Sequence, residues 1–179
     1  MKASQILIPR SFAHLVFLFA LACALPAAAQ APVYAIGNRV WFDTDNSGTI
    51  NGAETGINGV TVNLYAAGDL STALATATTT NSGYYLFNNL DAGDYVVAIA
   101  ASNFSGVLQD YWSSGTSRAN DGSLGETTAP AANGDIDSDD NGTLRTSGLL
   151  TGAVVSSVIT LGPGATSEPT GETDLDGGD

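Results

Sequence analysis

The stretch GYYLFNNLDAGDYVVAIA, residues 83–100, decides the fold class. Tyr85 and Phe87 alternate with their neighbours, and the alternation resumes at Tyr95 after a turn at residues 91–93. A period of two residues is that of a β-strand with one face toward a core and the other toward solvent. The stretch therefore predicts two strands joined by a turn.

The same signature recurs on both sides of this stretch, as β-branched and aromatic runs separated by Gly, Asn, Asp and Ser. No segment has the period of an amphipathic helix. We expect residues 102–151, which are poor in apolar side chains, to form a long connection that is either flexible or organised by a ligand. Strands are predicted at residues 34–42, 59–66, 73–80, 84–88, 94–101 and 153–161. This pattern predicts an all-β sandwich.

The first residues have the features of a secretory signal peptide. Lys2 and Arg10 precede an apolar run that ends in small residues at Ala29. Cleavage there would remove residues 1–29 and leave one domain, residues 30–179, of which 162–179 form an acidic tail. The apolar run is shorter than the roughly 20 residues of a spanning helix, so we expect no membrane span after cleavage. The predicted location is secreted or extracellular, with cell-surface association as an alternative.

Charge and missing residue types limit the function. Without the signal peptide, three arginines oppose 18 acidic residues, which excludes nucleic acid as a partner. The only Lys, His and Cys of the chain are Lys2, His14 and Cys23, all within residues 1–29. The mature chain would then lack a disulfide and the usual general bases, so paired carboxylates would be its only acid/base chemistry. We do not expect an enzyme.

The string DTDNSGTINGAE, residues 43–54, has the spacing of an EF-hand-type calcium loop. Positions 1, 3, 5, 7, 9 and 12 of that loop supply oxygens to a hard cation, and position 6 is the glycine of a sharp turn. Strand-like sequence flanks the loop on both sides, which favours a structural calcium site over a helix-opening sensor. The ligand positions are occupied by Asp43, Asp45, Ser47, Thr49, Asn51 and Glu54.

A second acidic cluster follows in NGDIDSDDNG, residues 133–142. Its carboxylates also alternate, and their crowding favours a bound cation over solvated charge. The candidate metal ligands are Asp135, Asp137, Asp139 and Asp140.

Three aromatic residues are candidates for stacking on a sugar ring. Trp41 alternates with Val40 on a predicted strand, and we interpret it as a core residue. Tyr111 and Trp112 lie among polar loop residues, where they form either a ligand-binding platform or a small hydrophobic cluster.

The chain resembles the B-type domain of bacterial serine-aspartate repeat surface adhesins, a relative of Cna-B and prealbumin-like domains. The resemblance runs from IGNRVWFDTDNSGTINGAETGINGVTVNLY (36–65) through GYYLFNNLDAGDYVV (83–97) to DSDDNG (137–142) and ITLGPGATSEPTGETD (159–174). It implies an Ig-like β-sandwich in which several calcium ions rigidify an extracellular module. It also implies calcium ligation by Asp43, Asp45, Ser47, Thr49 and Glu54, and by Asp137, Asp139 and Asp140.

Two departures from that family are visible. The lysine of the isopeptide crosslink common in Cna-B domains is missing from the mature chain, and no apolar last strand follows GETDLDGGD. Two explanations follow: either the chain is a fragment, or a partner that pairs with an exposed edge supplies the missing strand. The predicted function is a calcium-binding structural or adhesive module with an extracellular protein or glycan as partner. A carbohydrate-binding module is the alternative.

Overall fold

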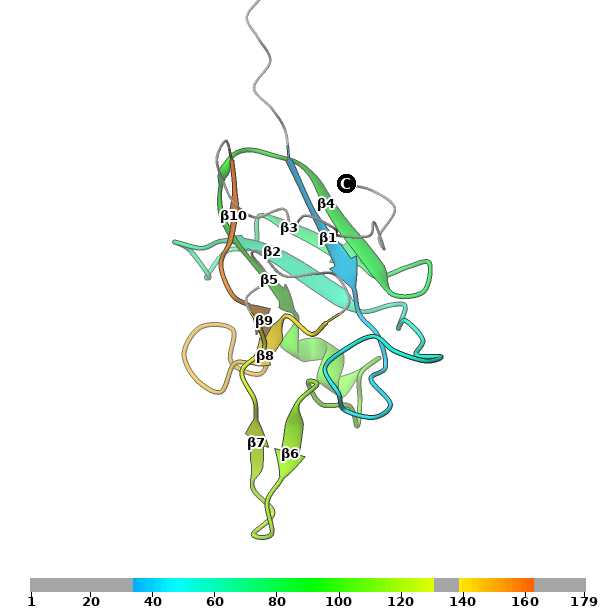
Figure 1. Cartoon of the computed structure of the whole chain (residues 1–179). Helices are drawn as coiled ribbons and strands as arrows, with labels where there is room; N and C mark the ends of the chain where they lie inside the picture. Colours follow the sequence, from blue (N-terminus) through cyan, green and yellow to red (C-terminus); the bar gives the residue numbers. More distant parts are fainter. Residues whose placement is uncertain (1–33, 131–138, 163–179) are drawn as a thin grey trace, which may run out of the picture. The chain divides into compact units, whose positions relative to one another are not determined.

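Two β-sheets face each other across one hydrophobic core in the computed structural model, which describes residues 34–130 and 139–162 (Figure 1). The smaller sheet pairs β1 (Tyr34–Arg39) with β4 (Tyr84–Leu90) in antiparallel orientation. The larger sheet has the order β3-β2-β5-β9-β8, and β10 also pairs with β5. Its strands are β2 (Thr61–Ala66), β3 (Ala75–Thr78), β5 (Gly93–Ile99), β8 (Gly142–Leu144), β9 (Val154–Ser156) and β10 (Ile159–Leu161).

The core lies between the two sheets and is made of the inward side chains that alternation predicts. Phe87 projects from β4 onto Leu64 and Val62 of β2, both of which are fully buried. Tyr95 and Val97 of β5 complete the same cluster. The predicted all-β, Ig-like sandwich is confirmed.

One predicted strand, residues 153–161, is divided in two by a bulge. Val155 of β9 pairs with Ala98 of β5, whereas Ile159 of β10 pairs with Tyr95 of β5. The register against β5 therefore shifts by one residue between β9 and β10. At the irregular point the Ser156 hydroxyl accepts the hydrogen bond of the Val97 N–H (3.0 Å). This serine replaces the backbone acceptor that a regular ladder would supply.

The expectation that each strand has one solvent face is wrong for β5. Val96 and Ala98 point away from the main core but are also buried, in a second cluster with Tyr65 and Val155. Leu70 from the β2–β3 turn and Leu150 from the β8–β9 turn pack against that cluster. Because β5 lies in the middle of the sheet and these turns fold over it, both of its faces are apolar, as on other doubly covered strands.

The expected connection, residues 102–151, is more regular than the sequence predicts. It begins with a 3₁₀ helix at Ala101–Ser105, and it contains β8 and a projecting hairpin of β6 (Thr116–Arg118) and β7 (Leu124–Glu126) (Figure 1). These strands have three residues each and few apolar side chains, so they give no detectable alternation. Their regularity comes from hydrogen bonds rather than from a buried face.

The predicted signal peptide, residues 1–29, lies outside the described residues. Of the predicted acidic tail, 162–179, only Gly162 is described, so the expectation of a missing last strand stays a prediction.

Backbone segments approach so closely at Gly56 and Gly83 that no side chain fits. A Cβ on Gly56 would lie 1.4 Å from the Ser82 carbonyl oxygen, and one on Gly83 would lie 2.1 Å from that of Val40. Gly83 also has a φ of +97°, which side chains disfavour. This contact joins the end of β1 to the turn before β4.

We expect Gly83→Ala to destabilise the domain by about 2 kcal/mol or more, because the added methyl group combines a backbone clash with a left-handed φ. Urea unfolding measures the effect. Gly68→Ala is the matched control, since its Cβ would meet no atom within 4 Å. Equal stabilities of the two variants would contradict the close contact.

Candidate metal centre

The candidate calcium loop is the tip of a two-stranded arm that extends from the sandwich. Phe42 N–H donates to the Thr55 carbonyl (2.9 Å), and Ile57 N–H donates to the Val40 carbonyl (2.8 Å). Trp41 pairs with Gly56 between these bonds. This short ladder holds the two ends of the loop together, as the paired helices do in an EF-hand.

The structure brings together the predicted carboxylates at both ends of the loop. One oxygen from each of Asp43, Asp45 and Glu54 lies within 4.8 Å of the others. Glu54 is 9% exposed, and its Oε1 accepts hydrogen bonds from Thr44 N–H (2.7 Å) and Thr44 Oγ1 (3.1 Å). Its Oε2 accepts from Asn51 N–H (3.0 Å), so backbone contacts fix both carboxylate oxygens.

The middle of the loop places oxygens of Asp45, Ser47 and Thr49 around the side chain of Asn51. Gly48 has a φ of +75°, which makes the sharp turn predicted at position 6. The Asn51 side-chain nitrogen lies 3.0 Å from Ser47 Oγ, 3.3 Å from Asp45 Oδ2 and 3.4 Å from the Thr49 carbonyl oxygen. A donor group therefore lies among oxygens of three of the residues predicted to bind calcium.

Half of the second acidic cluster lies against this loop. Asp139 pairs with Thr49, and Asp140 N–H donates to the Gly48 carbonyl (2.8 Å). The structure thus joins two segments that the sequence separates by about 90 residues. The other two candidates, Asp135 and Asp137, lie outside the described residues.

Glu126 belongs to the same region and was missed by the sequence analysis. Its Oε2 accepts the Leu144 N–H (2.7 Å), while its Oε1 is buried without a hydrogen-bond partner. Glu126 ends the hairpin strand β7, and only the position of that hairpin beside β8 brings Glu126 toward Asp140. No spacing signal in the sequence links it to either acidic motif.

Two carboxylates respond in opposite ways to this environment. Burial opposes ionisation of Asp43, but hydrogen bonds from Ser114 and from the Gly48 and Ser47 N–H groups outweigh it and lower its pKa. Burial raises the pKa of Asp140 to about 6, although the Gly142 N–H opposes the shift. The negative charges of Glu126, Asp139 and Asp43 contribute to the same rise in pKa.

The three candidate aromatic residues lie in different environments. Tyr111 and Trp112 are 42% and 65% exposed, and Tyr111 meets Phe42 edge-on with ring centroids 5.4 Å apart. The interpretation of Trp41 as a core residue is wrong, because Trp41 is half-buried. It lies on the arm opposite Gly56, whose missing side chain cannot cover the indole.

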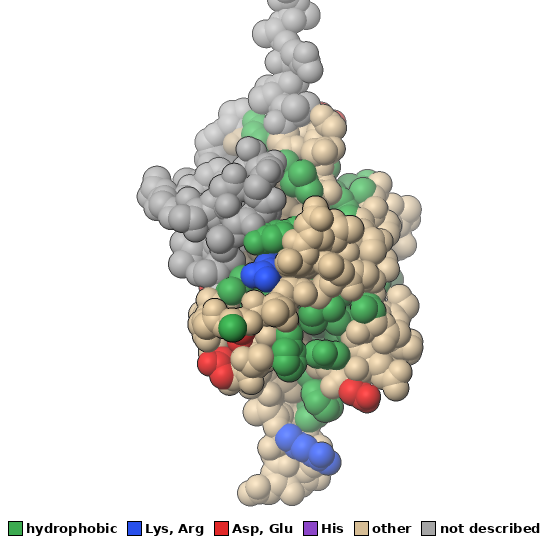
Figure 2. Space-filling model, turned by 90° about the vertical axis from the view of Figure 1, so that its right-hand side faces the viewer, with side chains coloured by type: hydrophobic (Ala, Val, Ile, Leu, Met, Phe, Trp, Pro, Cys, Tyr) green, Lys and Arg blue, Asp and Glu red, His purple; other side chains and the backbone are tan. Residues whose placement is uncertain are grey.

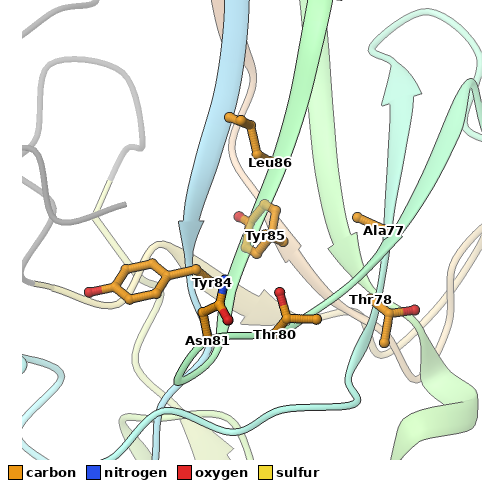
Figure 3. A pocket seen from close by; sticks show the side chains of 7 residues that line it. All are labelled: Ala77, Thr78, Thr80, Asn81, Tyr84, Tyr85 and Leu86. Atoms are coloured by element: carbon orange, nitrogen blue, oxygen red, sulfur yellow. The ribbon is translucent and has the colours of Figure 1, made fainter. Parts of the chain in front are cut away.

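A separate surface pocket of about 310 Å³ opens between β3 and β4 (Figure 3). Ala77 and Thr78 line it from β3, and Tyr84 to Leu86 line it from β4. Thr80 and Asn81 complete the lining, which contains no carboxylate. The pocket therefore offers no pair of carboxylates for acid/base chemistry.

Comparisons with known proteins agree with the geometry. A sequence profile described as SdrD B-like domain matches residues 34–149. Serine-aspartate repeat-containing protein I of Staphylococcus saprophyticus is 44% identical over 68 residues, which cover 38% of this chain and 4% of that protein. Fibrinogen-binding protein of Staphylococcus epidermidis is 35% identical over 113 residues, covering 63% of this chain and 10% of that protein.

A relative also occurs outside the staphylococci. Colossin-B of Dictyostelium discoideum is 35% identical over 75 residues, which cover 38% of this chain and 2% of that protein. The chain spans no more than a tenth of the length of any of these three relatives. Within the described residues, no helix has the length and hydropathy needed to span a membrane.

The raised pKa of Asp140 predicts an unusual pH dependence in the absence of calcium. Because the folded pKa of about 6 lies above the unfolded value, the contribution of Asp140 to stability is present below about pH 4 and lost as the pH rises through 6. With a chelator at pH 7, Asp140→Asn should therefore stabilise the fold by on the order of 2 kcal/mol. Denaturant unfolding across this pH range measures it.

Asp69→Asn is the control for this measurement, because Asp69 is exposed in the β2–β3 turn and hydrogen bonds from Ser71 lower its pKa, so its substitution should leave the pH dependence above about pH 5 unchanged. Parallel pH profiles for Asp140→Asn and the unsubstituted chain would contradict the assignment.

Proposed function

The chain belongs to the SdrD B-like domain family, and from this premise we propose that it is a secreted structural or adhesive module braced by calcium rather than an enzyme. The observation that carries the proposal is the grouping of one carboxylate oxygen from each of Asp43, Asp45 and Glu54 within 4.8 Å of one another. Hard cations such as calcium take 6 to 8 oxygen ligands, and this loop offers carboxylate, hydroxyl and carbonyl oxygens at the required spacing.

The Asn51 amide stands in for the cation. Its N–H groups are the only donors within the loop that face Ser47 Oγ, Asp45 and the Thr49 carbonyl together among the described contacts. A calcium ion at this point would satisfy the same oxygens with a full positive charge. Asn51 would then present its Oδ1 to the ion, which requires only rotation of the terminal amide.

A second calcium position between the loop and β8 accounts for the remaining carboxylates. Asp140 is crowded by Glu126, Asp139 and Asp43, and the buried Oε1 of Glu126 has no partner. Uncompensated charges of this kind are costly in a protein interior. A shared cation would neutralise them, with Asp43 lying between the two positions.

Calcium at these positions would act as a brace. The loop contacts β6 through Asn46, whose side chain donates to the Thr116 carbonyl (3.2 Å) and accepts from Gly115 N–H (2.9 Å). It contacts the segment before β8 through Asp140. Ordering the loop therefore fixes segments that have little core of their own, which suits a module that must keep its shape outside the cell.

Extracellular location and an adhesive role come from the family and the sequence. The relatives include proteins named for serine-aspartate repeats and for fibrinogen binding. The sequence of residues 1–29 has the features of a signal peptide, which supports export. An extracellular ligand, protein or glycan, is the corresponding partner, and calcium is the corresponding cofactor.

Calcium should raise the melting temperature of the secreted chain. At a free calcium concentration 100 times the dissociation constant, one site contributes about 2.7 kcal/mol, which corresponds to a shift of several degrees. Glu54→Gln should remove most of this shift, because it deletes the charge of the ligand that closes the loop. Differential scanning calorimetry with calcium and with chelator measures both effects.

Asp69→Asn changes the net charge by the same amount and should keep the full response to calcium. An equal melting temperature with and without chelator in the unsubstituted chain would rule out the brace.

The second position predicts a change in stoichiometry. Glu126→Gln should lower the number of calcium ions bound per chain by one while the loop site remains, because Glu126 does not contact the loop ligands through any described hydrogen bond. Isothermal titration calorimetry counts the ions. Unchanged stoichiometry in Glu126→Gln would leave the loop as the binding site and remove the second one.

A further inference from the structure

Three exposed aromatic side chains lie on the two segments next to the calcium loop, and we call them the aromatic surface: Phe42, Tyr111 and Trp112. Trp112 is the most exposed of the large hydrophobic side chains in the described residues, at 65%. Hydrophobic side chains gather on the face of the molecule drawn in Figure 2. Phe42, Tyr111 and Trp112 are rings supplied by two short segments next to one site.

Contacts on both sides hold these segments in place. Phe42 N–H is bonded to Thr55, and Tyr111 N–H donates to the carbonyl of Leu108 (3.1 Å), which is buried in the main core. After Trp112, Ser113 Oγ donates to the Gly142 carbonyl (3.3 Å). Ser114 Oγ donates directly to Asp43 of the loop.

Exposed rings on an anchored backbone are well suited to binding. A segment that is already held loses little conformational entropy when a partner covers it, and large aromatic rings supply much contact area. In the free chain these three rings stay in contact with water, and only a bound partner would bury them. Their exposure is therefore the mark of an interaction surface rather than of a folding core.

The charge around the rings selects the partner. The charged residues nearest in sequence to the rings are Asp43 next to Phe42 and Asp110 next to Tyr111, and the whole chain has a formal charge of −13. Aromatic faces attract Arg and Lys, and this chain uses that interaction itself where Arg39 lies 5.4 Å from the Tyr84 ring centroid. A cation would meet both the rings and the Asp110 carboxylate favourably, while Asp43 is engaged by the calcium loop.

We propose that the aromatic surface docks a positively charged polypeptide segment of an extracellular protein, with Arg or Lys side chains stacked on Trp112 and Tyr111. This inference rests on the proposed adhesive function and names the chemistry of its partner. Phe42 supports Tyr111 from the edge, and Asp110 supplies the opposite charge. The loop positions both ring-bearing segments through Asp43 and Phe42.

Binding of fluorescein-labelled hexa-arginine to the full secreted chain, measured by anisotropy with saturating calcium at physiological ionic strength, tests the proposal. Trp112→Ala should weaken binding roughly tenfold, the loss expected for one cation–π contact. Leu149→Ala removes another exposed apolar side chain, of 57% exposure, and should leave binding unchanged. Equal affinity of Trp112→Ala and the unsubstituted chain would overturn the proposal.

A spectroscopic readout separates docking on the rings from general attraction to an acidic protein. Trp41→Phe leaves Trp112 as the only tryptophan of the chain, whose emission should shift to the blue when hexa-arginine covers it. No shift at saturating peptide would mean that the peptide binds elsewhere. Glycan binding that is lost in Trp112→Ala, with peptide binding retained, would assign the surface to sugar instead.

The two proposals fail separately. If chelator leaves the melting temperature unchanged but Trp112→Ala still weakens peptide binding, the calcium brace is wrong and the aromatic surface stands. If calcium stabilises the chain and Trp112→Ala has no effect on the peptide, the reverse holds.

Discussion

Repulsion among carboxylates that the backbone holds together is the constraint on which this end of the molecule depends. Asp43 anchors the loop and accepts hydrogen bonds from Gly48 and Ser114, while Asp140 joins the same region through the Gly48 carbonyl. The Asp140 contact brings a second negative charge close to the first. The fold thus creates a place where positive charge is worth more than it would be in solvent.

The sandwich can tolerate this local cost because its own stability comes from elsewhere. Leu64, Val62 and Val60 are completely buried between the sheets, and Val96 and Ala98 are buried on the outer face of β5. These clusters contain no charged group. The acidic region lies beyond the sheets, on an arm and on short strands, so changes in its charge act on the periphery before they act on the core.

Hydrogen bonds join the loop, the β6–β7 hairpin and the segment before β8 to one another. Asn46 of the loop bonds to the base of the β6–β7 hairpin, Glu126 at the end of that hairpin bonds to β8, and Asp140 returns to the loop. The segment that carries Tyr111 and Trp112 is joined to the same hydrogen-bonded segments through Ser113 and Ser114. A cation that orders the loop would therefore also order the hairpin and the exposed rings, without any rearrangement of the sheets.

The sequence by itself determined the alternating strands around residues 83–100, the sandwich class and the ligand spacing of residues 43–54, because these depend on local periodicity and on fixed offsets along the chain. It could not reveal the two buried faces of β5, the short strands β6, β7 and β8, or the half-exposed position of Trp41, since each depends on which distant segment lies opposite. Glu126 is the clearest case. In the sequence its carboxylate is an ordinary charged side chain. Only the position of the β6–β7 hairpin beside β8 buries one of its oxygens near Asp140. Tertiary structure decided that feature because charges interact through space, whatever their separation in the chain.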